Sequence, residues 1–122
     1  MPIKKILVVD DSPTERLALS ELLVKNGYQV VTAENGDEAV AKSKQEMPDL
    51  ILMDVVMPGT NGYQATRAIS REPSTINIPV IICTSKSLET DKIWGMRQGA
   101  HDYMVKPLDH AVLLDKIKAL NS

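Results

Sequence analysis

The sequence predicts a doubly wound α/β domain, in which five parallel strands alternate with five helices. Short apolar segments alternate with amphipathic ones along the whole of its 122 residues, which is the pattern of repeated strand–helix units. Three of the apolar segments are nearly continuous, as expected of parallel strands covered on both faces. Right-handed crossovers then place the helices on both faces of one sheet.

The predicted strands are short, partly β-branched and bounded by turn or charged residues. They are 6–9, 29–33, 50–53, 80–83 and 103–105. The fourth strand contains Cys83, which we interpret as a small core residue, since free cysteine is among the most buried residue types.

The first helix has signals at both ends. Residues 12–15 (Ser-Pro-Thr-Glu) form a predicted capping box with proline at the first helical position. Gly27 stands where a helix usually ends. Four further helices are delimited by proline, glycine or asparagine, at about 37–46, 61–72, 88–98 and from 109 onward.

Composition narrows the class of protein. The chain is 43% apolar, with a formal net charge of −2 and one cysteine. These values indicate a globular protein without a nucleic-acid footprint, in a reducing compartment. No apolar run approaches the ~20 residues of a membrane span, and the N-terminus lacks a signal-peptide core. We expect a single-domain, monomeric, cytoplasmic protein with no nucleic-acid partner and no membrane insertion.

Chemically capable residues follow four of the five predicted strands. They are Asp10 and Asp11, Asp54, Thr84, and Lys106. Ligands of open parallel sheets bind beyond the carboxyl ends of the strands, so we expect these side chains to meet at one edge. Three carboxylates brought together need a neutralising cation, and oxygen ligands favour Mg²⁺. An aspartate beside a divalent cation, an ammonium and a hydroxyl is a phosphoryl-acceptor site.

Simpler readings exist for each residue taken alone. Asp10 and Asp11 are equally explained as acidic residues that favour a helix N-terminus, and Asp54 as a strand-ending turn residue.

Two other protein classes are alternatives to a phosphoryl-acceptor domain. An aspartate-nucleophile phosphatase needs an Asp-x-Asp motif, whereas Asp10 and Asp11 are adjacent. A flavin-binding protein needs a phosphate loop after the first strand, where the acids would repel the phosphate.

Four motifs support a family resemblance. They are 8–12 (Val-Val-Asp-Asp-Ser), 52–54 (Leu-Met-Asp) with Met57–Pro58 and Gly62, 82–85 (Ile-Cys-Thr-Ser), and 102–103 (Asp-Tyr) with Lys106–Pro107. On these motifs the chain resembles CheY-like response regulator receiver domains over essentially its full length. The resemblance implies a flavodoxin-like sheet in the order 2-1-3-4-5, and a receiver domain over residues 1–122 with no output domain.

The resemblance also implies a role for each site residue. Asp54 would accept a phosphoryl group from a CheA-like histidine kinase, with Lys106 and Thr84 beside it. Asp10, Asp11, Asp54 and the backbone carbonyl of Val56 would hold Mg²⁺. The protein would be a signalling domain rather than an enzyme, with at most self-catalysed phosphoryl transfer and slow autodephosphorylation. The Lys106–Pro107 bond would often be cis in the family.

The family's switch maps onto two residues, Thr84 after the fourth strand and Tyr103 on the fifth. Thr84 would move toward the phosphoryl group and Tyr103 would turn inward behind it, which remodels the face formed by the fourth helix, fifth strand and fifth helix. Trp94, on the fourth helix, would lie with Tyr103 on this partner-binding face. The alternatives are a half-buried strand tyrosine and a tryptophan packed in the core.

Three segments are similar to PilH-type single-domain regulators of the type IV pilus (twitching-motility) chemosensory system. They are 11–15, 62–67 and 89–99. In such a pathway the phosphorylated protein would control an effector or act as a phosphate sink for a shared kinase. The sequence leaves these two roles open.

Two positions differ from the best-known chemotaxis pattern, Val56 and Lys86, which flank the site in family members. An apolar side chain at position 56 cannot hydrogen-bond an attacking water. We therefore expect the wild-type phosphoryl group to last longer than that of a Val56→Asn variant. Loss of label from phosphorylated protein measures both lifetimes, and an equal or shorter wild-type lifetime would contradict the expectation.

Overall fold

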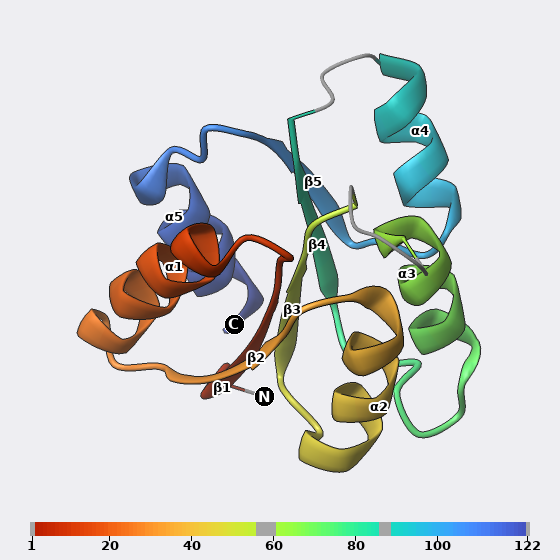
Figure 1. The fold of residues 1–122 in the computed structure, drawn as a ribbon, viewed down its shortest axis with the longest axis horizontal. Coiled ribbons are helices and arrows are strands. Elements are labelled where there is room, and N and C mark those ends of the chain that lie inside the picture. The colour runs from red at the N-terminus through yellow and green to blue at the C-terminus, as the bar shows by residue number, and fades with distance from the viewer. Residues whose placement is uncertain (1, 56–60, 86–88, 122) are drawn as a thin grey trace.

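The computed structural model describes residues 2–55, 61–85 and 89–121. Its core is one five-stranded, all-parallel sheet in the order β2-β1-β3-β4-β5 (Figure 1), which confirms the predicted topology. The strands are β1 Lys5–Val9, β2 Gln29–Ala33, β3 Leu50–Met53, β4 Val80–Thr84 and β5 Asp102–Val105. Each differs from the predicted range by at most one residue at either end.

The described residues form five helices, four between successive strands and one after β5. They are α1 Pro13–Lys25, α2 Gly36–Glu46, α3 Gly62–Arg71, α4 Glu89–Arg97 and α5 His110–Leu120. Helices α1 and α5 cover one face of the sheet, and α2, α3 and α4 cover the other (Figure 1). In the part of the chain that the structure describes, no helix is long and apolar enough to cross a membrane.

The core consists of two layers, one on each face of the sheet. Successive side chains of a strand point to opposite faces. Leu7 and Val9 therefore pack toward α2 and α3, whereas Ile6 and Val8 pack toward α1 and α5. Strands β3 and β4 are buried throughout, which explains why their sequences lack polar alternation.

The predicted capping box of α1 is only half formed. The Ser12 hydroxyl accepts the backbone N–H of Glu15 at 3.3 Å, as expected. The Glu15 carboxylate does not return to the Ser12 N–H, which donates to Asp10 Oδ1 at 3.0 Å instead. Glu15 contacts the Lys106 ammonium, because a cation is a stronger partner for a carboxylate than a backbone amide.

A reciprocal capping box occurs at α3, where we predicted only a helix start. The Asn61 side chain accepts from the Gln64 N–H, and the Gln64 side chain accepts from the Asn61 N–H. Gly27 and Gly99 have φ of +92° and +106°, so the predicted glycine stops of α1 and α4 are confirmed. The Lys106–Pro107 bond is cis.

Gly62 lies in contact with the backbone that follows β3. A Cβ at this position would lie 2.1 Å from the carbonyl oxygen of Asp54 and 2.7 Å from the Cα of Val55. Side chains therefore cannot be added here without displacing the backbone that carries Asp54. This close approach explains why helix α3 begins with glycine.

We expect Gly62→Ala to lower the free energy of unfolding by about 1–3 kcal/mol, the usual cost of overpacking. Gly95→Ala is the matched control, because the atom nearest its Cβ is the flexible end of Ile82 and alanine favours a helix. Tyr63 Cε1, at 3.1 Å, is also a side-chain atom, so Gly95→Ala meets no backbone, and its loss should be smaller than about 1 kcal/mol. Urea denaturation measures both, and a Gly95→Ala loss equal to that of Gly62→Ala would contradict the backbone clash.

Candidate functional site

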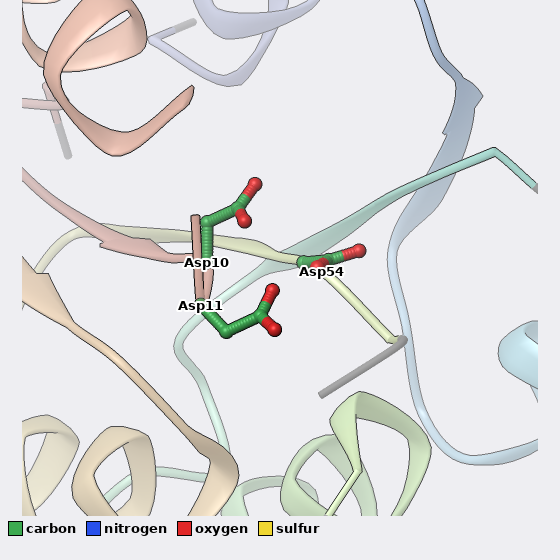
Figure 2. Close-up of side chains that lie close together, drawn as sticks. All are labelled: Asp10, Asp11 and Asp54. Carbon is green, nitrogen blue, oxygen red and sulfur yellow. The ribbon is translucent and has the colours of Figure 1, made fainter. Parts of the chain in front are cut away.

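Three carboxylates meet at the carboxyl edge of the sheet. One oxygen from each of Asp10, Asp11 and Asp54 lies within 4.8 Å of the others, and the side chains point into one space (Figure 2). Asp10 and Asp54 are buried, whereas Asp11 is exposed. The structure thus brings together the three acids that the sequence predicted to meet.

Backbone pairing places the two buried acids. Strand β1 pairs with β3 so that Val9 is opposite Met53, and the following residues are Asp10 and Asp54. The Asp54 N–H donates to the Val9 carbonyl at 3.0 Å, and the Asp10 N–H donates to the Ala33 carbonyl at 3.1 Å. Backbone pairing therefore fixes where both side chains leave the sheet.

Lys106 places a positive charge beside the acids. Its Nζ lies 2.8 Å from Asp10 Oδ2, 2.9 Å from Glu15 Oε2 and 3.7 Å from Asp54 Oδ1. Burial alone would lower the pKa of Lys106, but hydrogen bonds to Asp10 and Glu15 and the charge of Asp54 raise it above its usual value. Lys106 therefore remains an ammonium at neutral pH.

Thr84 completes the set of predicted site residues. It is fully buried at the end of β4, the strand between β3 and β5. Its carbonyl accepts the Lys106 N–H at 2.7 Å, which ties the ends of β4 and β5 together. An open cleft of about 540 Å³ lies over this edge and is lined by Asp11, Glu15, Asp54, Ser85, Lys106 and Pro107.

Two charged residues of α1 belong to the site although sequence reasoning did not assign them. Glu15 binds Lys106, as described above. Arg16 Nη1 donates to the Asp10 carbonyl at 2.8 Å, and its Nη2 lies 3.4 Å from Glu34. Their position in the first turns after Asp11 is the only sequence signal, because Lys106 and Glu34 are distant from them in the chain.

Tyr103 of β5 is buried beneath α4, whereas Trp94 of α4 is exposed. Tyr103 is buried in the core cluster under α4, with only 8% of its surface exposed. A Cβ at Gly95 would lie 3.4 Å from its ring, so Tyr103 is close beneath this helix. Trp94 is 52% exposed; the core interpretation of Trp94 is wrong, as is the half-buried interpretation of Tyr103.

Cys83 is buried beneath the site, as predicted. Burial raises the pKa of its thiol to about 12, which outweighs the opposite effect of Lys106. A protonated, enclosed thiol is a poor nucleophile. Cys83 is therefore part of the core and takes no part in the chemistry.

The two flanking positions Val56 and Lys86, including the predicted Val56 carbonyl ligand, lie outside the described residues.

Comparison with known proteins identifies the family. The model of the response regulator receiver domain matches residues 6–118. This chain belongs to the response regulator receiver family. Receiver domains are signalling modules that accept phosphoryl groups from histidine kinases. The chain is 56% identical over 116 residues to the protein PilH of Pseudomonas aeruginosa, which covers 95% of this chain and 96% of PilH.

Solved receiver structures have the same fold. The chemotaxis protein CheY4 of Vibrio cholerae superimposes with a TM-score of 0.90 and 32% identity, covering 97% of this chain and 98% of CheY4. The receiver domain of the sensor histidine kinase PA1611 of P. aeruginosa has a TM-score of 0.90 and 31% identity, covering 98% of both chains. That structure has a magnesium ion coordinated in its active-site cleft.

The acidic cluster of this receiver has the chemistry of a metal site. Asp10, Asp11 and Asp54 offer three carboxylate oxygens within one coordination sphere, and hard divalent cations prefer such ligands. Glu15 adds a fourth acid, and Lys106 forms ion pairs with Asp10, Glu15 and Asp54. A divalent cation would offset the remaining negative charge, and exposed Asp11 leaves one side open to water.

Proposed function

We propose that Asp54 is the phosphoacceptor of this receiver, with Mg²⁺ bound by Asp10, Asp11 and Asp54. The observation that carries the proposal is the placement of Asp54, a buried carboxylate in the metal-binding cluster with Lys106 Nζ at 3.7 Å. The magnesium ion in the PA1611 receiver cleft supports the choice of metal. A fourth protein ligand, the Val56 carbonyl, is part of the proposal through family resemblance alone.

The proposed transfer needs little from the protein beyond position and charge. An Asp54 carboxylate oxygen attacks phosphorus, and the O–P bond forms as the P–N bond of the kinase phosphohistidine breaks. The electron pair of that bond stays on the imidazole nitrogen. Lys106 neutralises charge on the phosphoryl oxygens, and Thr84 donates its hydroxyl to one of them. When bound, Mg²⁺ supplies further charge neutralisation.

The same residues would link the phosphoryl group to a partner-binding face. Thr84 and Tyr103 lie on adjacent strands, with Thr84 in register with Val105 and Ile82 with Tyr103. We propose that movement of Thr84 and Tyr103 alters the surface of α4, β5 and α5. Five of the nine exposed large hydrophobic residues in the described ranges lie on these elements: Ile93, Trp94, Met96, Val105 and Val112.

A pathway follows from similarity rather than geometry. We propose that the protein acts in the cytoplasm, downstream of a CheA-like kinase, in a type IV pilus chemosensory system that controls twitching motility. The support is 56% identity to PilH over nearly all of both chains. The exposed apolar residues on α4, β5 and α5 are the surface that we propose binds an effector, whereas a phosphate sink would need to bind only the kinase.

The central test is phosphorylation by acetyl phosphate in the presence of Mg²⁺. We expect the wild type to incorporate one phosphoryl group and Asp54→Asn to incorporate none, because an amide cannot form the acyl phosphate. Removal of Mg²⁺ with EDTA should abolish labelling. Asp115→Asn, an exposed aspartate of α5, is the matched control and should label normally. Persistent labelling of Asp54→Asn under these conditions would refute the assignment.

Effector binding can be separated from the sink role with a phosphate mimic. We expect immobilised wild-type protein to retain a cellular partner when beryllofluoride and Mg²⁺ are present. Trp94→Ala should reduce retention at least about tenfold, as expected for an interface tryptophan. Val24→Ala, a similarly exposed apolar residue of α1, should have no effect. Equal capture with and without beryllofluoride would favour the phosphate sink.

A further inference from the structure

The Lys106 ammonium hydrogen-bonds to two carboxylates other than that of the proposed acceptor. Its two hydrogen-bonding partners are Asp10 at 2.8 Å and Glu15 at 2.9 Å. The nearest Asp54 oxygen lies at 3.7 Å, which is an ion pair beyond hydrogen-bond distance. An ammonium has three donors, and two of them are thus engaged with carboxylates other than the acceptor.

Glu15 reaches Lys106 from the first turn of α1. Its backbone N–H caps the helix through Ser12, so the position of Glu15 is set by the helix and not by Lys106. Its side chain bridges to the end of β5, 91 residues away in the chain. Substitution of this side chain leaves the N-cap hydrogen bond in place, and the helix should fold normally.

A phosphoryl group on Asp54 would give the Lys106 ammonium a further anionic partner. Its oxygens carry negative charge that an ammonium neutralises. Glu15 competes with them for Lys106, and its own charge at the cleft repels an incoming phosphate group. Asp10 is less affected by this competition, because it is a proposed ligand of the metal. Glu15 has no role in that proposed metal site or in the acceptor.

We propose that Glu15 is a positioning residue that holds Lys106 in its hydrogen bond to Asp10, beyond hydrogen-bond distance of Asp54, and thereby slows phosphoryl acceptance. This inference rests on the proposed function of Asp54. Glu15 is half exposed, and water screens such a pair. The restraint is therefore modest, and we expect its removal to accelerate phosphorylation by about two- to fivefold.

The test compares phosphorylation rate constants with acetyl phosphate at saturating Mg²⁺. Glu15→Gln should accelerate labelling by that factor. Glu15→Asp keeps the charge but draws the carboxylate back by about one bond length, ~1.5 Å, so it should also accelerate labelling. Glu21→Gln, an exposed glutamate further along α1, makes the same change in net charge and should match the wild type.

A second readout does not depend on the transfer step. The affinity for beryllofluoride at saturating Mg²⁺, measured by calorimetry, should rise by a similar factor in Glu15→Gln, because the phosphate mimic also requires Lys106. A structural role for Glu15 in α1 would change the melting temperature instead and would leave this affinity unaltered.

Three outcomes would overturn the proposal. One is an unchanged or lower rate for Glu15→Gln, and another is a Glu15→Asp rate equal to that of the wild type, which would assign the effect to charge alone. The third is equal acceleration by Glu21→Gln. Failure of the proposed function is distinguishable, because the wild type itself would then not be labelled on Asp54.

Discussion

Parallel pairing of β1 with β3 is the constraint on which the rest of the site depends. Because the strands run in the same direction with Val9 opposite Met53, the residues that follow them emerge at one edge, and Asp10 lies beside Asp54. Backbone hydrogen bonds fix the positions of both residues without any contribution from their side chains. Pairing of β3 with β4 and of β4 with β5 adds Thr84 and Lys106 to the same edge by the same rule.

Concentrating acids at this edge carries an electrostatic cost that the fold offsets only in part. Lys106 contacts Asp10 and Glu15 and forms a longer ion pair with Asp54, while Arg16 supports the Asp10 backbone. Like charges held together favour a cation between them, so the incomplete neutralisation makes this cluster suited to a divalent metal. One ammonium shared among three acids also makes the position of Lys106 sensitive to each of them.

Strands β4 and β5 belong both to the site and to the proposed partner-binding face. Strands β4 and β5 carry Thr84 at the site and Tyr103 in the core beneath α4. Gly95 allows α4 to approach Tyr63 and Tyr103 closely. Little free space is therefore left beside Tyr103 to accommodate a change in its position. Close packing of this kind transmits small displacements rather than damping them, which is how the proposed switch would connect the edge chemistry to the exposed apolar surface of α4, β5 and α5.

The sequence by itself determined the order of strands and helices and the acids, threonine and lysine at the strand ends. Those signals are local, since apolar runs, glycine or proline stops and the residues after each strand lie close together in the chain. Only the tertiary structure decided that Glu15 binds Lys106 instead of closing the capping box, that Arg16 supports Asp10, and that Trp94 faces solvent while Tyr103 is buried. These choices depend on which distant side chain arrives beside each residue, and no local pattern encodes such a partner.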